Sequence, residues 1–326
     1  MKKKIAVVYG GDSSEYVVSM KSKVNVYNSI DKNVFDVWCV ELRGGVARVM
    51  QDDEQLAMID LADFSFNLKG EKCKFDFAYI TIHGAPGENG VLQGYFDMIN
   101  MPYSCCGVQS AALTFNKFFC SNFLRSFGIP MAKQLRYFKG NDIDVEAVVS
   151  KLGLPLFVKP NSGGSSFGAT RVMAKEELLP AIEKAWNESA DVLVEEFVEG
   201  KEFTCGLLKL KNKSYIFPVT EIIPQNDFFD YDAKYNGQVE EITPARISEE
   251  LNKQIQTRAS EIYDLCECKG IARVDFILRN GTFHFLEVNT TPGMTATSFI
   301  PQQIAAMGES LTNILTEIIH DSLTTN

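Results

Sequence analysis

Apolar and polar positions in the first third of the chain predict strands that alternate with a helix. Residues 3–9 form the continuous apolar run of a buried strand, residues 10–14 have turn composition, and the apolar stripe that follows predicts a helix. Residues 34–42 and 75–82 are further strand candidates. We therefore expect an N-terminal α/β domain over residues 1–105, built on a mostly parallel sheet.

Strand and helix patterns continue through the rest of the chain. Residues 156–159 and 191–197 predict strands, whereas residues 249–269 and 302–323 predict amphipathic helices. A further helix carries Phe residues along one side and has Lys117 in its first turn. A cation is disfavoured at that end of a helix, so we expect an anion near Lys117 unless the side chain is simply solvated.

Residues 270–293 read GIARVDFILRNGTFHFLEVNTTPG and predict a β-hairpin. With a two-residue turn at Asn280-Gly281, side-chain alternation would send Asp275 and Glu287 to opposite faces of the hairpin. A three-residue loop with Gly281 in the left-handed region would place them on the same face. We predict the three-residue loop.

In that register, Arg273 lies opposite Glu287 and shares one face with Asp275, Asn289 and Phe285. Two carboxylates and an amide oxygen at a strand end form an oxygen-only site that suits Mg²⁺ with bound phosphates. Arg273 is then expected to contact the negative charge that develops during a reaction at this site, rather than to neutralise the carboxylates. The alternative is an exposed sheet face with scattered charges.

Composition narrows the class of protein. The chain has 326 residues, 45% of them hydrophobic and 23% charged, which is ordinary for a globular protein of two or three domains. Its net charge of −10 argues against sequence-independent binding of nucleic acid. The eight cysteines include no C-x-x-C pair and there are three histidines, so we expect free thiols in a reducing cytoplasm rather than a zinc site.

The chain shows no sign of membrane insertion. Lysines at residues 2–4 precede an apolar run that is too short for a signal peptide. No stretch approaches the length of a membrane span. We therefore expect a cytoplasmic protein without a membrane partner.

Several loops carry candidate chemistry. The loop PNSGGSSFG at residues 160–168 lies between two strand patterns and could wrap its backbone N–H groups around a phosphate, or be a mobile linker. It is not a Walker A loop, because Ala169 stands where the lysine should be. Glu15 at the start of the first helix reads most simply as a helix cap. Residues 225–237, QNDFFDYDAKYNG, have the composition of an ordered functional loop or lid.

The segment FLEVNTTPGMT, preceded by GIARVDF, resembles the C-terminal signature of D-alanine:D-alanine ligases of the ATP-grasp superfamily. Further matching segments follow in order along nearly the whole chain. The resemblance implies an α/β protein, α+β in part, with a three-domain ATP-grasp fold. Its N-terminal domain would hold a Rossmann-like parallel sheet, and two α+β domains, residues 106–198 and 199–326, would clasp ATP.

The resemblance also implies roles for individual residues. Those expected to act in catalysis are Glu15, Ser165, Tyr235, Arg273 and Gly293. Those expected to bind the amino-acid substrates are His83, Ser298, Phe299 and Lys234. Those expected to bind ATP are Lys117, Lys159, Ser166, Glu195, Phe197, Val198 and Glu202. The metal ligands would be Asp275, Glu287 and Asn289.

The function implied is ligation of two D-alanine molecules to D-alanyl-D-alanine through an acyl phosphate, for peptidoglycan precursor synthesis. ATP would be the co-substrate, with two Mg²⁺ ions for which Mn²⁺ can substitute, and the enzyme would be a homodimer. Tyr235 favours the dipeptide product, whereas Val17 and Gly163 depart from the family pattern. The alternatives are a ligase that uses D-lactate or D-serine as the second substrate, and a nucleotide-binding regulator without catalysis.

Overall fold

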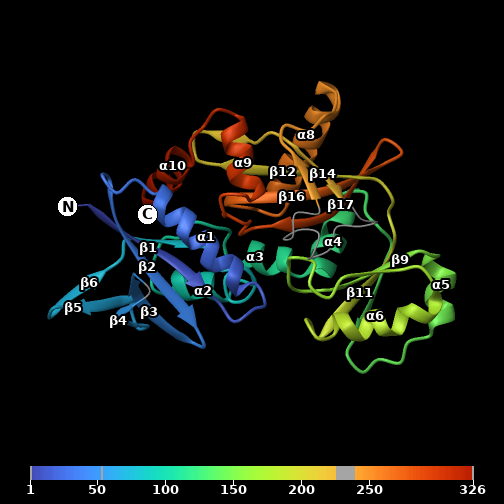
Figure 1. Ribbon diagram of the computed structural model, residues 1–326, viewed down its shortest axis with the longest axis horizontal. Coiled ribbons are helices and arrows are strands. Elements are labelled where there is room, and N and C mark those ends of the chain that lie inside the picture. Colours follow the sequence, from blue (N-terminus) through green and yellow to red (C-terminus); the bar gives the residue numbers. More distant parts are fainter. Residues whose placement is uncertain (1, 53, 225–238, 325–326) are drawn as a thin grey trace.

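Three β-sheets with helices packed against them form the protein (Figure 1). The structure is a computed structural model that describes residues 2–52, 54–224 and 239–324. In Figure 1 the N-terminal sheet lies at the left, the central sheet with α5 and α6 at the lower right, and the C-terminal sheet above both. Mixed α/β architecture was predicted from the sequence and is confirmed.

The N-terminal sheet has the strand order β6-β5-β4-β3-β2-β1-β7. Its strands are β1 (Lys3–Gly10), β2 (Phe35–Arg43), β3 (Val46–Gln51), β4 (Glu54–Asp60), β5 (Ser65–Leu68), β6 (Glu71–Lys74) and β7 (Phe77–Ile80). Strand β1 pairs in parallel with β2 and β7, but the pairings from β2 to β6 are antiparallel, so the prediction of a mostly parallel sheet is wrong. The strands from β3 to β6 were not predicted, because β4 and β6 are largely exposed and β5 and β6 have four residues each.

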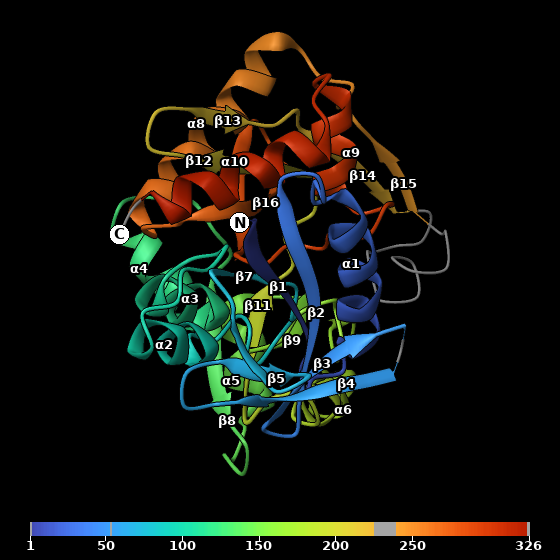
Figure 2. The same ribbon diagram turned by 90° about the vertical axis from the view of Figure 1, so that its left-hand side faces the viewer.

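Helices α1 (Tyr16–Ser29) and α2 (Val91–Met98) belong to the same domain. Helix α1 packs against β1 and buries Val26 with Ile5 and Val7 in one core cluster. That cluster also includes Ile318 near the end of the chain, so the C-terminal helix closes over the N-terminal sheet. Figure 2 shows α10 and both termini on this side of the molecule.

The central sheet is antiparallel, with the order β10-β9-β11-β8. Its elements are β8 (Gln134–Phe138), α5 (Val145–Leu152), β9 (Leu156–Pro160), β10 (Thr170–Val172), the 3-10 turn η1 (Lys175–Glu177), α6 (Leu178–Ala185) and β11 (Asp191–Glu196). One face is covered by α5 and α6, which bury Val148 and Ile182 against Val158 and Val194. Strands β9 and β11 confirm the strands predicted at residues 156–159 and 191–197.

The C-terminal sheet has the order β15-β14-β12-β16-β17, with β13 beside β12. Its strands are β12 (Lys201–Lys209), β13 (Ser214–Ile216), β14 (Thr220–Pro224), β15 (Val239–Ile242), β16 (Gly270–Arg279) and β17 (Thr282–Asn289). The helices around it are α3 (Val108–Phe115), α4 (Lys117–Arg125), α8 (Glu249–Leu265), α9 (Phe299–Ala306) and α10 (Leu311–Leu323).

Two features differ from the sequence-based expectation for this region. The single helix predicted over residues 302–323 is two helices, because the chain turns at Gly308, whose φ of 81° lies in the left-handed region. Cys120 and Leu124 of α4 share a core cluster with residues of β12 and β16. Helix α4 therefore packs on the C-terminal sheet, and the predicted domain boundaries stay predictions.

Candidate active site

The hairpin of β16 and β17 closes with a two-residue turn, so the predicted three-residue loop is wrong. Arg279 pairs directly with Thr282, and Asn280 and Gly281 between them have φ values of 49° and 78°. Two consecutive residues with positive φ are typical of a type I′ turn, which asparagine followed by glycine adopts readily.

A β-bulge restores the register that the turn alone would not give. Phe276 pairs with Phe285, but the next pair is Asp275 with Glu287, which leaves Leu286 as the extra residue. Asp275 and Glu287 therefore share one face, as expected, although Asp275 was predicted to lie opposite Phe285 rather than opposite Glu287. The pairing of Arg273 with Glu287 was predicted wrongly, because Arg273 pairs with Asn289. Phe285 pairs with Phe276 and lies with it in the core, so its predicted place on the face of Glu287 is wrong.

The Asp275 carboxylate is the centre of a hydrogen-bond network. The guanidinium of Arg273 donates two bonds to it, Nε to Oδ1 at 2.9 Å and Nη2 to Oδ2 at 2.7 Å. Thr204 donates at 2.5 Å and the Asn289 amide at 3.1 Å. Arg273 and Asp275 are 7% and 8% exposed, so their charges compensate each other in a buried place. The expectation that Arg273 leaves the carboxylates unpaired is thus wrong for this state.

Lys117 is the first residue of α4, and it meets an anion as predicted. Its ammonium lies 3.5 Å from the Glu287 carboxylate and donates a 2.5 Å hydrogen bond to the carbonyl of Gly163. Gly163 belongs to the loop of residues 160–168, here called the flap. A second buried ion pair joins Lys159 to Glu195 at 2.9 Å. Both lysines therefore lie inside the cleft next to a carboxylate.

Glu15 does not cap the helix that it precedes. It occupies the N-cap position of α1, yet its side chain accepts no hydrogen bond from that helix. The carboxylate instead accepts a 2.5 Å bond from the Ser165 hydroxyl of the flap. Ser165 and Ser166 have φ values of 53° and 57°, so the flap backbone is strained where it meets Glu15.

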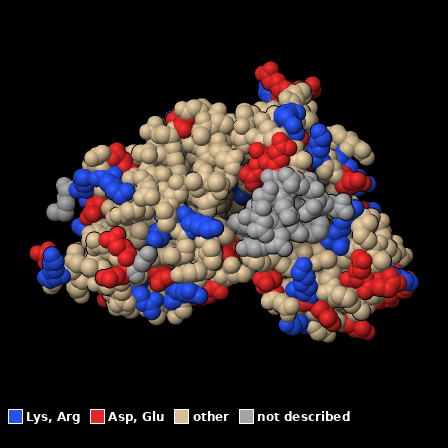
Figure 3. Space-filling view, in the orientation of Figure 1, with Lys and Arg blue, Asp and Glu red and all other residues tan. Residues whose placement is uncertain are grey.

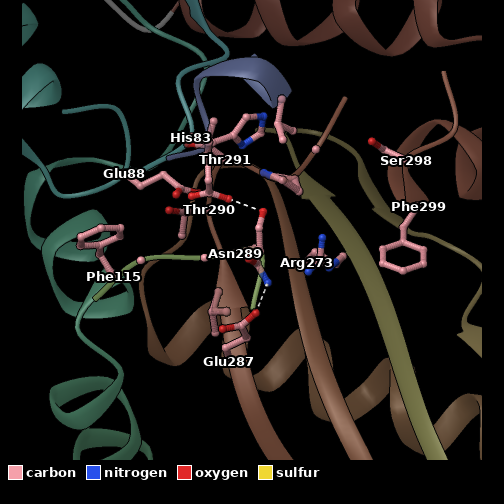
Figure 4. Close-up of a pocket in the computed structure, with 18 of the residues that line it drawn as sticks. His83, Glu88, Phe115, Arg273, Glu287, Asn289, Thr290, Thr291, Ser298 and Phe299 are labelled. Atoms are coloured by element: carbon pink, nitrogen blue, oxygen red, sulfur yellow. Dashed lines mark hydrogen bonds between the residues drawn. The ribbon is translucent and has the colours of Figure 1, made fainter. Parts of the chain in front are cut away.

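His83 and Glu88 line the same small cavity as Glu15. The His83 Nε2 atom lies 3.1 Å from the Ser22 hydroxyl of α1. The Glu88 carboxylate accepts a 2.7 Å bond from the Gly84 amide, and burial together with the charge of Glu15 raises the pKa of Glu88 to about 8. In Figure 4, Glu88 lies at one side of the cavity and Phe299 at the other.

Two cavities meet at this face of the hairpin. The larger, about 480 Å³, lies between the central and C-terminal sheets, and the smaller, about 120 Å³, lies toward α1. Figure 3 shows the surface hollowed where the central domain meets the rest of the molecule. The residues that line both cavities are Lys117, Gly163, Gly164, Ser165, Arg273, Glu287 and Phe299.

The structure brings nearly all the predicted site residues to these cavities. The larger one is lined by all the residues expected to bind ATP and by Asp275. The smaller one is lined by Glu15, His83, Asn289, Gly293 and Ser298. Lys234 and Tyr235 lie outside the described residues.

A close approach explains the glycine at residue 293. A Cβ atom there would lie 2.9 Å from the hydroxyl oxygen of Ser298, which accepts a 3.1 Å bond from the Thr295 amide. A larger residue would therefore displace Ser298 from the cavity wall. The backbone of residue 293 therefore lies next to the Ser298 side chain.

Two residues of the site were missed from the sequence. Arg171 of β10 lines the larger cavity, with its guanidinium 4.3 Å from the ring centre of Phe197. Thr204 of β12 pairs with Asp275 across the sheet and donates to its carboxylate. Only the strand pairing reveals the role of Thr204, because it lies far from Asp275 along the chain.

The donor atoms at the larger cavity fit a hard divalent cation. Asp275, Glu287 and Asn289 offer carboxylate and amide oxygens on one strand pair, which is the ligand chemistry that Mg²⁺ prefers. Among the residues that the structure describes, no group of three or more His, Cys, Asp or Glu side chains could hold a metal ion. Mg²⁺ prefers six oxygen ligands, so an ion held by these three side chains would also take oxygens from water or from a bound nucleotide.

These features define the class of protein. A cavity of nucleotide size lies between two sheets, with a flap over it and two largely covered lysines and an acidic strand pair inside it. This arrangement, together with an α/β N-terminal domain, is the ATP-grasp fold, and solved structures of the same fold cover almost the entire chain.

Comparisons with known proteins identify the family. The family model described as D-ala D-ala ligase N-terminus matches residues 4–106, and the one described as D-ala D-ala ligase C-terminus matches residues 123–320. The D-alanine–D-alanine ligase of Bacteroides fragilis is 54% identical over 322 residues, 98% of this chain and 99% of the relative. That of Porphyromonas gingivalis is 48% identical over 327 residues, 99% of each. The chain belongs to the D-alanine–D-alanine ligase family.

Solved structures agree with that assignment. D-alanyl-alanine synthetase A from Vibrio cholerae has a TM-score of 0.89 at 27% identity and covers 99% of both chains. The VanG D-Ala:D-Ser ligase from Enterococcus faecalis has a TM-score of 0.85 at 32% identity, covering 98% of this chain and 99% of that one. Within the described residues, none of the helices has the length and apolar character needed to cross a membrane.

Proposed function

We propose that the protein joins two D-alanine molecules to D-alanyl-D-alanine, with ATP converted to ADP and phosphate, for peptidoglycan precursor synthesis. The observation that carries this proposal is the wall shared by the two cavities. Lys117, Arg273 and Glu287 face both of them, so the phosphate end of a nucleotide in the larger cavity meets a small substrate in the other. Relatives named D-alanine–D-alanine ligase at about half identity over the whole chain support the same activity.

The chemistry explains why two adjoining cavities are needed. A carboxylate does not react with an amine in water, because its oxygen is a poor leaving group. Transfer of the γ-phosphoryl group of ATP to the carboxylate of the first D-alanine gives an acyl phosphate and ADP. The amine of the second D-alanine attacks the acyl carbon, the C–O bond to phosphate breaks, and the amine gives up a proton. The products are the dipeptide and inorganic phosphate.

The larger cavity is assigned to the nucleotide. Glu195, Phe197 and Val198 would hold the adenine, with Glu202 on the ribose. Lys117, Lys159 and Ser166 would hold the phosphates. A solved relative from Bacillus anthracis, whose title states that it is complexed with ATP, supports nucleotide binding in this fold. Phosphoryl transfer depends mainly on such positioning and on stabilisation of charge.

Asp275, Glu287 and Asn289 are proposed to hold Mg²⁺, two ions in all, with Mn²⁺ able to substitute. When bound, such ions neutralise charge on the transferred phosphoryl group. Holding them would require Asp275 to give up part of its bonding to Arg273. The guanidinium of Arg273 would then be available to the charge that develops next to it.

The smaller cavity is assigned to the two D-alanine molecules. Glu15 is proposed to receive the ammonium group of the first, next to His83. Arg273 and the backbone N–H of Gly293 are proposed to stabilise the oxyanion of the tetrahedral intermediate. Ser298 and Phe299 at the start of α9 are proposed to receive the carboxylate of the second. Lys234 and Tyr235 are proposed to cover the site, with Tyr235 near Ser165.

A second candidate function is favoured by one specific observation. The solved D-Ala:D-Ser ligase is 32% identical to this chain over almost its whole length, so the same fold accepts D-serine as the second substrate. D-lactate would be the corresponding ester-forming substrate. A regulator without catalysis is less well supported, because the site keeps Arg273 and all three proposed metal ligands.

A cytoplasmic location and a homodimeric state are also proposed. No disulfide joins any of the eight cysteines, all of which lie in the described part of the chain, and this fits a reducing compartment. Val91 and Met98 of α2 are 62% and 84% exposed, which is unusual for apolar side chains and fits a subunit contact. Light scattering of the purified protein would test the homodimer, and a monomer mass would reject it.

The proposed activity is tested by phosphate release from Mg-ATP with D-alanine alone, and with D-alanine plus D-serine or D-lactate, with products identified by mass. We expect release with D-alanine alone and a product of the mass of D-alanyl-D-alanine. Release only with a mixed pair would move the assignment to the second candidate. Tight ATP binding without turnover would favour the regulator.

A further inference from the structure

Asn161 lies where the start of the flap contacts α4, the helix that carries Lys117. It directly follows β9 and is fully buried. Its backbone N–H donates to the carbonyl of Asp191 in β11 at 3.1 Å, and its carbonyl accepts from the N–H of Lys117 at 3.1 Å. The backbone of Asn161, the second residue of the flap, thus ties the flap both to the central sheet and to the first residue of α4.

The side chain of Asn161 makes the same two connections again. Its Oδ1 atom accepts from the N–H of Phe118 at 2.8 Å, and its Nδ2 atom donates to the Asp191 carboxylate at 2.8 Å. The next N–H of α4, that of Phe119, is capped by Asn116 within the helix at 3.0 Å. Two of the first three N–H groups of α4 are therefore capped from the flap side.

Asp191 is itself held in place. The Arg136 guanidinium of β8 donates to its carboxylate at 2.5 Å and lies 5.0 Å from the ring centre of Phe118. Asn161, Asp191, Arg136 and Phe118 thus form a closed set of contacts that returns to α4. A buried network of this kind is rigid when every member is satisfied.

The two ends of this network belong to different packing units. Asp191 lies in the central sheet, whereas α4 buries Cys120 and Leu124 in the core of the C-terminal sheet. The larger cavity lies between these units, and Lys117 stands at the point where they meet. Figure 1 shows α4 next to β9 and β11, between the lower right and upper parts of the molecule.

We propose that Asn161 is a positioning residue, whose amide couples the base of the flap to α4 and so holds the Lys117 ammonium at the phosphate end of the cleft. The inference rests on the proposed function, in which Lys117 binds phosphate. Asparagine meets the requirement because it offers an acceptor to Phe118 and a donor to Asp191 from one planar group. Alanine offers neither, and aspartate would set a second carboxylate against Asp191.

The test compares Asn161→Ala with Asp144→Ala, a matched control. Asp144 caps α5 in the same domain, accepting from the Ala147 N–H at 3.0 Å, and lies outside both cavities. Both variants should lower the melting temperature. Only Asn161→Ala should raise the KM for ATP, by about tenfold, while the KM for D-alanine changes much less. An unchanged KM for ATP, or the same rise in the control, would overturn the proposal.

A second variant keeps the test decisive if Asn161→Ala does not fold. Asn161→Asp keeps the oxygen that caps Phe118, but it brings two carboxyl groups within hydrogen-bond distance, so one of them should take up a proton. The rise in KM for ATP relative to the unmodified protein should therefore be smaller at pH 6 than at pH 8. If the KM for ATP of Asn161→Asp, divided by that of the unmodified protein, is the same at both pH values, the role of the bond to Asp191 is contradicted.

Failure of the proposed function is separable from failure of this inference. If the unmodified protein released no phosphate with D-alanine, the activity would be wrong, yet ADP and ATP binding measured by calorimetry would still compare the variants. We expect Asn161→Ala to weaken ATP binding more than ADP binding, because the γ-phosphate depends most on Lys117. Equal weakening of both nucleotides would reject the positioning role.

Discussion

The carboxylate of Glu15 accepts a 2.5 Å hydrogen bond from the Ser165 hydroxyl, although 150 residues separate the two in the chain. The bond joins the N-terminal domain to the flap. A Cβ atom at Gly164 would come within 2.9 Å of the same carboxylate, so the flap can approach Glu15 this closely only with glycine there. The flap and Glu15 therefore form adjoining parts of the wall of the smaller cavity.

Replacing Glu15 with Gln should lower kcat/KM for D-alanine by about 10- to 100-fold, because a charge-assisted hydrogen bond to Ser165 becomes a neutral one and the proposed ammonium site loses its charge. Steady-state phosphate release at varied D-alanine concentration measures this effect. Ser14→Ala is the control, because Ser14 is exposed and bonds Glu188 at 3.2 Å instead. A wild-type kcat/KM for Glu15→Gln would remove Glu15 from the substrate site.

Replacing Asp275 with Asn should reduce kcat by about 100-fold or more and raise the Mg²⁺ concentration needed for half-maximal rate. The exchange removes one carboxylate charge and leaves Arg273 without its two-bond partner. A Mg²⁺ titration of the rate is the measurement. Asp264→Asn, which changes an exposed partner of Lys209, should leave the titration unchanged. Wild-type behaviour of Asp275→Asn would exclude Asp275 as a metal ligand.

Glu88 should make the folded protein less stable as pH rises. Its pKa is raised from 4.5 to about 8, so the folded state keeps a proton that the unfolded chain has lost between these values. The free energy of unfolding should fall by up to about 1.4 kcal/mol per pH unit in that range and level off above pH 8.

Glu88→Gln should remove this contribution, since glutamine keeps an acceptor for the Gly84 N–H and has no charge to bury. Urea unfolding at pH 5, 6, 7 and 8 gives the free energy of unfolding. For Glu88→Gln this free energy should depend less on pH than it does for the unmodified protein. Glu261→Gln on the exposed face of α8 is the control. Identical pH dependence for Glu88→Gln and the unmodified protein would contradict a raised pKa for Glu88.

Tyr235→Phe should increase the share of D-lactate in the product when D-alanine and D-lactate compete. The prediction rests on the family resemblance, because Tyr235 lies outside the described residues. Mass spectrometry of the dipeptide and the ester product gives the ratio directly. A ratio equal to that of the unmodified protein would show that Tyr235 does not select the second substrate.

Much of the site could be predicted because its residues carry local signals. The turn at Asn280-Gly281 and the apolar alternation around it located the hairpin, and the glycine and serine content of residues 160–168 located the loop that lines both cavities. The register could not be predicted, because the local pattern did not indicate the bulge at Leu286. The predicted loop length was wrong, yet the bulge gives Asp275 and Glu287 the common face that was predicted.

Contacts between segments that are distant in the chain could not be predicted from local sequence patterns. Glu15 has the sequence setting of a helix cap, and only the folded flap shows that it bonds Ser165 instead. Asn161 reads as one polar residue in a loop, yet it caps a helix 43 positions earlier in the chain. Residue type alone does not reveal such partners, because they are set by how the three sheets pack.

The most direct test of the central claim is the fate of the carboxylate oxygen of D-alanine. D-alanine labelled with ¹⁸O in its carboxylate is incubated with the protein and Mg-ATP, and the phosphate and dipeptide are analysed by mass spectrometry. If an acyl phosphate forms, one labelled oxygen passes to inorganic phosphate for each dipeptide made. Phosphate that carries no label while dipeptide accumulates would contradict the account.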